Sequence, residues 1–379
     1  MSLHLPPLLK RAVPLGLKKK LKAALDFIEE RRFAGSLAGR RFTPPKTGPA
    51  VNYGGKAPST GGFLHGGRVK LAHLEEAYPE TDNFNILYLV SSALPPHAHV
   101  LADWAADCGA KVALNQNGVG YPGWAGPDYD EINIPMRAVM GKANYVAYQS
   151  RFCQQSADKW LMKPSCPVEV IYNCVDTDVF TPPAEPLPAR PIRLLAAGSH
   201  YQDYRVISLL AAGALLLKKG LEVEIWVAGG LKWPGAEQET RKLIDNLKLD
   251  GRVKFLGGYT QNQAADIYRS CHILVHSKYN DPCPTVVIEA MACGLPVIGS
   301  ASGGMGELVG DSAGALIDVP QSWERTYFPG ASELASAVEK VAGNIEVLSK
   351  QSRARAVERF GKGEWLARHG AMFNRLLAG

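Results

Sequence analysis

The stretch that decides the fold runs over residues 272–309, HILVHSKYNDPCPTVVIEAMACGLPVIGSASGGMGELV. It begins with a short apolar run that predicts a buried strand, and a polar loop follows. Pro284 favours a first helical turn, and Gly294 is a stop signal, so we expect a short helix between them. A second apolar run and a Gly-Gly turn then follow. This alternation predicts an open α/β sheet, in which ligands bind at the carboxyl ends of the strands.

Two acidic residues stand out within this stretch. Asp281 lies in the polar loop, and Glu289 lies one turn into the helix on the same face as Thr285. A carboxylate on so apolar a helix needs a partner, because a buried unpaired charge is very costly. Two interpretations follow from the residues alone. Either Glu289 is a structurally paired acid and Asp281 a helix cap, or both acids belong to a ligand site.

The string DPCPTVVIEAMACGLPV resembles the nucleotide-sugar signature of the retaining, family-four glycosyltransferases of the GT-B fold, the glycosyl transferases group 1. That signature is an acid, seven residues and then Glu, followed by EAMA-x-G-x-PV and a GG-x-x-E segment. Asp281 stands where the family usually has Glu. The other matching positions are Glu289, Gly294, Pro296, Val297, Gly303, Gly304 and Glu307. The resemblance covers residues 49–379 and implies an α/β protein of two Rossmann-like, doubly wound domains that face a central cleft.

The resemblance also implies roles for single residues. Glu289 would hold the ribose hydroxyls, and Asp281 would hydrogen-bond the donor sugar and favour the positive charge that develops at its anomeric carbon. Relatives grip the diphosphate with an Arg and a Lys that follow a Gly. Here His200 and Arg205 follow Gly198 at the same five-residue spacing. Further residues placed in the nucleotide-sugar site are Cys283, Pro284, Thr285, Tyr259, Gly198, Gly303 and Gly304.

The pair after Gly198 leaves two alternatives open. If the pair replaces the family's cations, Arg205 supplies a permanent positive charge and His200 a titratable one. We expect Arg205 to be the main cation on the diphosphate, because no other Lys or Arg lies between Arg193 and Lys218. Otherwise helix N-termini and backbone N–H groups must stabilise the leaving group.

The N-terminal half contributes weaker candidates. Gly61 and Gly62 precede a predicted helix and either contact acceptor or phosphate or form a plain loop. Asn117 stands where many relatives place a His that contacts the transferred sugar, which leaves amide hydrogen bonding as the substitute. Tyr121 and Trp124 give the following loop an aromatic character suited to stacking on a sugar or another acceptor.

Composition limits the class of protein. The 379 residues are 46% hydrophobic and 21% charged, which is typical of a soluble globular protein of two or three domains. Seven cysteines without a CxxC pair favour a reducing, cytoplasmic setting. The pair His97 and His99 has no accompanying Cys or carboxylate cluster, so we expect no metal site. We expect no cofactor either, since the nucleoside-diphosphate sugar is a substrate.

Positive charge is concentrated in residues 1–50, where eleven Lys or Arg face three acids and give a net charge of +8. A helix over 17–33 would place Leu21, Leu25 and Ile28 on one side. One interpretation is peripheral contact of residues 1–40 with an anionic membrane. The alternative is a solvated helix packed on the body. We expect no nucleic-acid partner, because no binding module is recognisable.

We predict four parts of the chain: a basic N-terminal extension (1–48), an N-terminal Rossmann-like acceptor domain (49–185), a C-terminal Rossmann-like donor domain (186–350), and a C-terminal helix that crosses back to the N-terminal domain (351–379). The Pro-rich run 182–191 is the predicted linker between the two domains.

The sequence thus predicts a retaining glycosyltransferase that moves a sugar from a nucleoside-diphosphate sugar to an unknown glycan, lipid or small-molecule acceptor. One rival is a catalytically degenerate relative that binds a nucleotide-sugar or a partner, which the missing Arg/Lys pair favours. A second rival, a nucleotide-dependent oxidoreductase, calls for a G-x-G-x-x-G turn after the first strand, and the sequence has none there.

Overall fold

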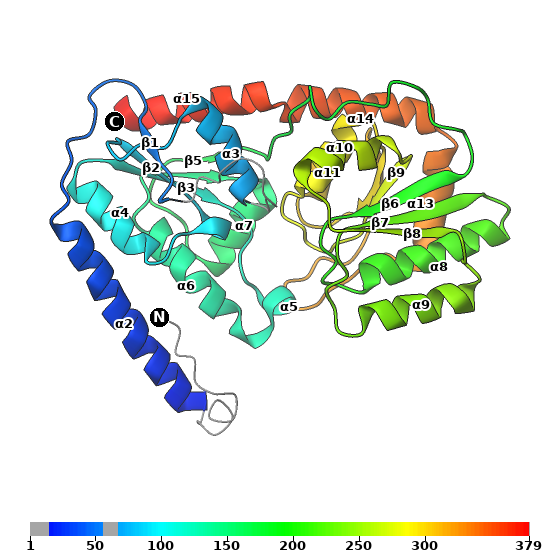
Figure 1. Ribbon diagram of the computed structural model, residues 1–379, viewed down its shortest axis with the longest axis horizontal. Coiled ribbons are helices and arrows are strands. Elements are labelled where there is room, and N and C mark those ends of the chain that lie inside the picture. The colour runs from blue at the N-terminus through cyan, green and yellow to red at the C-terminus, as the bar shows by residue number, and fades with distance from the viewer. Residues whose placement is uncertain (1–14, 56–66, 379) are drawn as a thin grey trace.

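Two parallel β-sheets with helices packed around them form the two halves of the protein (Figure 1). The computed structural model describes residues 15–55 and 67–378. The predicted site residues Gly61 and Gly62 lie outside this part of the chain. The predicted α/β class and the two separate sheets are confirmed.

The N-terminal sheet has the strand order β1-β2-β3-β4-β5. Its strands are β1 (Val51–Asn52), β2 (Ile86–Val90), β3 (Lys111–Gln116), β4 (Tyr145–Tyr148) and β5 (Val168–Val170). The helices of this half are α2 (Leu15–Ala38), α3 (Gly67–Ala77), α4 (Ala98–Asp107), α5 (Pro122–Ala125), α6 (Tyr129–Met140) and α7 (Arg151–Trp160). Strand β2, ILYLV, is buried along its whole length, which explains its continuous apolar sequence.

The C-terminal sheet has the strand order β11-β10-β9-β6-β7-β8. Its strands are β6 (Ile192–Ala197), β7 (Val223–Ala228), β8 (Val253–Gly257), β9 (Ile273–His276), β10 (Val297–Ser300) and β11 (Gly314–Ile317). The helices are α8 (Tyr204–Lys218), α9 (Ala236–Leu247), α10 (Gln261–Arg269), α11 (Thr285–Ala292), α12 (Met305–Val309), α13 (Ala331–Ala342), α14 (Ile345–Phe360) and α15 (Lys362–Ala378).

The order in which strands are added to the C-terminal sheet reverses between β6 and β9. Strands β7 and β8 are added on one side of β6, and β10 and β11 on the far side of β9. The two central strands pair in parallel, with Leu194 opposite Ile273. In open α/β sheets the ligand binds at such a reversal, beside the carboxyl ends of the two strands. The fold therefore places the expected site in the loops after β6 and β9.

The last helices connect the two halves. Helices α14 and α15 run along one side of both sheets, as Figure 1 shows. Phe360 at the end of α14 belongs to a core cluster of the C-terminal half. Trp365, Met372 and Phe373 of α15 belong to a core cluster of the N-terminal sheet. The chain therefore returns to its first half at its end.

Helix α2 leads away from the N-terminal half (Figure 1). Leu37, near its C-terminal end, is buried in the core beside α4, and Phe33 packs against the same cluster. Leu21, Leu25 and Ile28 are exposed. Within the described residues, no helix combines the length and the apolar character needed to cross a membrane.

Candidate functional site

The loop after β9 carries an ionised carboxylate. Asp281 Oδ2 lies 2.9 Å from His276 Nε2 and 3.2 Å from Lys278 Nζ, and the side chain is buried. Burial by itself raises the pKa of Asp281, but Lys278, His276 and Arg205 outweigh burial and hold that pKa well below its usual range. Asp281 therefore keeps its negative charge at every physiological pH, at the carboxyl end of a central strand.

Two glycines of the predicted signature fix the position of this loop. The Gly304 N–H donates to the Asp281 carbonyl oxygen at 2.9 Å. A Cβ atom at Gly303 would lie 2.4 Å from that carbonyl oxygen, and one at Gly304 would lie 2.1 Å from the Pro282 carbonyl oxygen. Only glycine fits so close to another backbone. The Gly303–Gly304 turn thus packs directly against the backbone of the loop that carries Asp281 and fixes the position of this loop.

Glu289 is buried in α11 with two neutral partners. Gln261 Nε2 donates to Oε1 at 2.6 Å, and the Tyr268 hydroxyl donates to Oε2 at 2.9 Å. Burial raises the pKa of Glu289 to about 7. Tyr259 contacts both Tyr268 and the backbone of Gly198, so these predicted residues form one group at the reversal point. Sequence analysis did not identify Gln261 and Tyr268, because only the fold brings α10 beside α11.

The start of α11 lies between these two acids. Pro284 occupies the position before the helix, where no side chain caps the first N–H groups, and Thr285 begins it. Asn173 Nδ2 donates to the Cys283 carbonyl oxygen at 2.7 Å and so ties this turn to the N-terminal half. Cys283 is buried, and burial raises the pKa of its thiol, so it remains neutral. The structure places all three predicted residues at one helix N-terminus, which favours anions.

Arg205 lies at the start of α8 beside the reversal point, as its position in the sequence predicts. Its Nη1 and Nη2 donate to the carbonyl oxygens of Ser199 and Ala197 at 2.8 and 3.0 Å. Among the described residues, its Nε has no partner. The guanidinium group is therefore buried and largely bound to the loop after β6. Its role as the cation of the site stays a prediction.

His200 differs from the expectation of a titratable cation. The side chain is fully buried, and its Nε2 lies 3.1 Å from the Ala228 carbonyl oxygen. Burial, and next the charge of Arg205, lower the pKa of His200 to about 3. The imidazole is therefore neutral at pH 7 and supplies no positive charge there. Lys278, which sequence analysis did not identify, is a partly exposed cation in the loop after β9.

On the N-terminal side, Asn117 lies just beyond β3. Its Nδ2 donates to Ser92 Oγ at 2.5 Å, and its Oδ1 accepts from Lys70 Nζ at 2.8 Å. A Cβ atom at the next residue, Gly118, would lie 3.1 Å from Pro282. The edge of the N-terminal sheet therefore meets the loop that carries Asp281. Sequence analysis did not identify Lys70, which resembles one of the solvent-facing residues of a polar helix.

Further contacts join the two halves at α12 and at Trp323. Glu307 of α12 accepts the backbone N–H groups of Arg151 and Phe152 at 2.8 and 3.0 Å, at the N-terminus of α7. Gly123 N–H donates to the Trp323 carbonyl oxygen at 2.7 Å. The Trp323 ring packs edge-on to Tyr121, with centroids 5.0 Å apart. Of the predicted aromatic loop, Tyr121 is therefore buried against the other half, whereas Trp124 is exposed.

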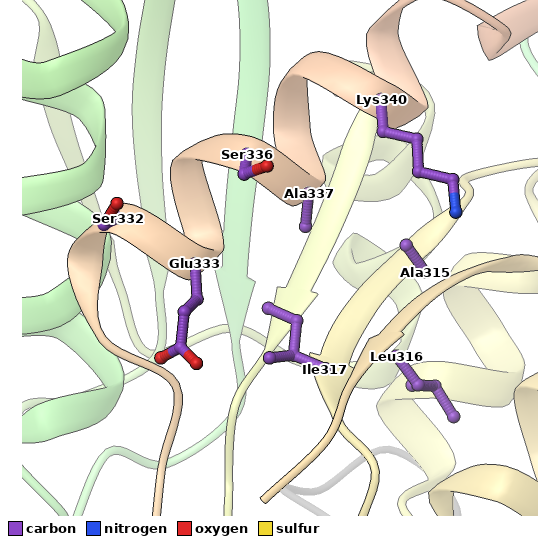
Figure 2. A pocket seen from close by; sticks show the side chains of 8 residues that line it. All are labelled: Ala315, Leu316, Ile317, Ser332, Glu333, Ser336, Ala337 and Lys340. Carbon is purple, nitrogen blue, oxygen red and sulfur yellow. The ribbon is translucent and has the colours of Figure 1, made fainter.

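Two other features lie apart from this site. Within residues 15–55 and 67–378, no group of three His, Cys, Asp or Glu side chains is placed to hold a metal ion. A pocket of about 390 Å³ lies between α13 and the edge strand β11 (Figure 2). Its lining residues are Ala315, Leu316, Ile317, Ser332, Glu333, Ser336, Ala337 and Lys340. Glu333 there accepts the Gly330 N–H, and no predicted site residue lines the pocket.

Comparison with known proteins supports the sequence resemblance. Residues 181–326 match the family described as "Glycosyl transferases group 1". The chain is 30% identical over 161 residues to D-inositol 3-phosphate glycosyltransferase of Mycolicibacterium smegmatis. This match covers 40% of this chain and 36% of that protein. It is 28% identical over 221 residues to the same-named protein of Salinispora arenicola, covering 51% and 49%. The chain thus spans about half or less of the length of these relatives.

Solved structures show the same fold. Anabaena HepE in complex with UDP is similar with a TM-score of 0.62 and 19% identity, over 81% of this chain and 80% of that one. Sucrose-phosphate synthase from Thermosynechococcus elongatus is similar with a TM-score of 0.61 and 20% identity, over 82% and 77%. These likenesses confirm the predicted two-sheet architecture of the GT-B type.

Proposed function

We propose that this chain, whose residues 181–326 match the glycosyl transferases group 1, transfers a sugar from a nucleoside-diphosphate sugar to an acceptor with retention of configuration. One observation carries the proposal. Asp281 and Glu289 lie at the reversal point of the C-terminal sheet, and the N-terminus of α11 lies between them. A permanent negative charge suits a developing oxocarbenium ion, and a helix N-terminus suits a departing diphosphate.

In this proposal each group has one task. Glu289 accepts hydrogen bonds from the ribose hydroxyls, since its two protein partners leave lone pairs free. Asp281 hydrogen-bonds the donor sugar and stabilises positive charge at its anomeric carbon. Arg205 and the N–H groups that start α11 stabilise the diphosphate. Asn117, from the N-terminal half, contacts the transferred sugar through its carboxamide.

A panel of nucleoside-diphosphate sugars tests this proposal, with release of the free nucleotide as the readout. UDP-glucose is the first probe, because the similar structure of Anabaena HepE has also been solved with UDP-glucose. We expect release of UDP from at least one UDP-sugar, and NMR of the product should show the anomeric configuration of the donor. Asp281→Asn is the matched control and should release little. No release from any donor by a protein that binds UDP would refute transfer.

Binding of UDP without release from any donor is what a second candidate function, a catalytically degenerate binding module, predicts. The two terminal nitrogens of Arg205 bind backbone carbonyls, and His200 is neutral at pH 7. A site whose cations are committed in this way binds a nucleotide-sugar with weak leaving-group stabilisation. A degenerate binding module would therefore retain affinity for UDP and show no turnover with any acceptor or with water.

We also propose that residues 1–40 contact an anionic membrane surface. Leu21, Leu25 and Ile28 are spaced by four and three residues, so they share one side of α2, and all three are exposed. At 3.6 residues per turn, the buried Leu37 lies on nearly the opposite side of the helix. The helix thus packs with one side and leaves an apolar strip free on the other, within residues 1–50, whose net charge is +8. Such helices lie in membrane interfaces.

A cytoplasmic setting is part of the same proposal. All seven cysteines are free, and five of them are buried. Free thiols in this number are typical of a reducing compartment. Peripheral binding to the inner face of an anionic membrane is compatible with that setting.

A further inference from the structure

Lys70 of α3 is a buried cation surrounded by neutral groups. Its Nζ donates to Asn115 Oδ1 at 2.8 Å, to Asn117 Oδ1 at 2.8 Å and to Gln149 Oε1 at 2.9 Å. An ammonium group has three donors, so all of them are used. In the part of the chain that the structure describes, no carboxylate forms an ion pair with it. We call these four side chains the Lys70 cage.

Among the described residues, the surroundings of the cage offer no compensating charge either. Lys70 is 5% exposed, and its pKa is lowered by burial to about 8. The titratable groups that face it from other elements are Cys153, Cys174, Cys283 and His369. Burial raises the pKa of each of the three thiols and lowers that of His369 to about 4, so all four groups are neutral at pH 7. Burying a lone charge in this way costs stability.

The cage lies at the carboxyl ends of β3 and β4 in the N-terminal sheet, close to the loop after β9 that carries Asp281. Asn115 and Asn117 stand at the end of β3, and Gln149 directly follows β4. A Cβ atom at Gly118, the residue after Asn117, would lie 3.1 Å from Pro282, the neighbour of Asp281. The cage therefore lies at the boundary between the two halves and not in the middle of a core.

We propose that Lys70 is a positioning residue for sugar transfer: its ammonium group holds three carboxamide oxygens on its own side, so that the NH₂ group of Asn117 lies on the other, where one N–H donates to Ser92 Oγ and the second N–H is presented to the sugar. The effect of this orientation on sugar transfer rests on the proposed function. The oxygen and nitrogen of an amide are nearly equal in size, so packing alone does not choose between the two orientations. A charged donor that accepts nothing does choose. The cage therefore fixes the orientation of the Asn117 amide.

The cage predicts a loss of turnover at alkaline pH. Above about pH 8 Lys70 is neutral and has two N–H donors and a lone pair, so one amide oxygen loses its partner and that amide is free to invert. Unfolding does not explain such a loss. Because the folded pKa lies below the usual 10.5, the unfolded chain binds more protons between these values, and the free energy of unfolding contributed by Lys70 rises with pH.

An NMR titration of the full-length protein tests the cage without any substrate. Lysine labelled at Cε reports each ammonium group, and Lys70→Arg identifies the Lys70 signal. We expect that signal to titrate near pH 8 and the side-chain NH₂ signals of Asn115, Asn117 and Gln149 to move with the same midpoint. A Lys70 midpoint above pH 10, or amide signals that do not follow it, would overturn the inference.

Turnover provides the second arm, with release of UDP from UDP-glucose as the probe reaction. Lys70→Met should lower turnover at pH 7 by about 100-fold, since small misplacements of a contact group have effects of this size. The surface variant Lys219→Met should stay within about twofold, as is usual for an exposed ion pair. Asn115→Asp places a carboxylate in the cage, so the fall in turnover should move to higher pH.

The outcomes separate the two ideas. An alkaline fall with a midpoint near 8 that Asn115→Asp moves upward supports the inference, because a purely structural lysine would not move a pH profile. A pH profile that Asn115→Asp leaves unchanged contradicts it. If the wild-type protein turns over no nucleoside-diphosphate sugar, the proposed function fails, and the NMR titration alone decides whether Lys70 sets the amide orientation.

Discussion

Glu289 combines a buried carboxylate with two neutral donors, so its affinity for hydroxyl groups depends on its own protonation. Its pKa of about 7 means that lowering the pH from 8 to 6 converts most of the carboxylate to the acid. We expect the affinity for UDP, measured by calorimetry, to fall about tenfold over that range. Glu289→Ala should cost about 2–4 kcal/mol of binding at pH 8 with the fold intact. Equal affinity of a folded Glu289→Ala variant would contradict the ribose contact.

Asp281 has the opposite acid–base behaviour. Lys278 and His276 keep it ionised far below neutral pH, so turnover should show no acidic limb from this residue. Asp281→Asn keeps the shape and an acceptor oxygen but removes the charge. We predict nearly normal affinity for UDP and turnover lowered by about 100-fold, the usual scale for losing one electrostatic contact in a transition state. Normal turnover with full affinity would make Asp281 a loop-fixing residue only.

Arg205 and Lys278 are rival cations for the diphosphate, one buried and bound to carbonyls, the other partly exposed. If Arg205 grips the diphosphate, Arg205→Ala should weaken UDP far more than uridine, and Arg205→Lys should not restore the forked contact. Lys278→Ala is the matched comparison. A selective loss of UDP affinity in Lys278→Ala alone would assign the phosphate contact to the loop after β9.

Among the elements, helix α2 packs on the core with one side, through Leu37, and exposes Leu21, Leu25 and Ile28 on the other. Deleting residues 1–40 would remove Leu37 from the core, so point changes on the free strip are the cleaner test. Leu25→Glu combined with Ile28→Glu should weaken binding to anionic vesicles and leave UDP affinity unchanged. Ala34→Glu, an exposed position on another side of α2, is the control for added charge. Vesicle binding that all three proteins share, or that none shows at low salt, would refute membrane contact by the strip.

Most elements follow from local pattern, and the site does so only in part. The apolar runs before Gly198 and after His272 predict β6 and β9, and the stop at Gly294 predicts the end of α11. Strand β11 was not predicted, because Gly314–Ile317 is a short, half-buried edge strand without a distinct period. Lys70, Gln261 and Tyr268 were not identified because their partners are distant in sequence. A lysine on a short helix that also carries His73 and Glu75 is typical of a solvated helix face, and only the fold shows that Lys70 is buried.

At the scale of the whole molecule, Trp323 connects the aromatic loop of one half with the donor half. Its ring stacks on Phe152, with centroids 5.2 Å apart, and its carbonyl oxygen accepts the Gly123 N–H. Trp323→Ala should loosen the two halves, raise the radius of gyration in X-ray scattering and lower turnover. UDP affinity should change little, because the nucleotide contacts proposed above lie within the C-terminal half. Trp124→Ala, an exposed ring on the same loop, is the control. An unchanged radius of gyration and turnover would show that the other contacts between the halves, such as those of Glu307, suffice.

The return of α15 to the first sheet has a consequence for recombination. Its 17 residues include Trp365, Met372 and Phe373, which fill one face of the N-terminal sheet beside Leu71 and Tyr88. A chimera that takes everything after the linker from a relative would therefore replace part of the wrong core. Grafts should keep residues 362–378 from the same parent as residues 51–170.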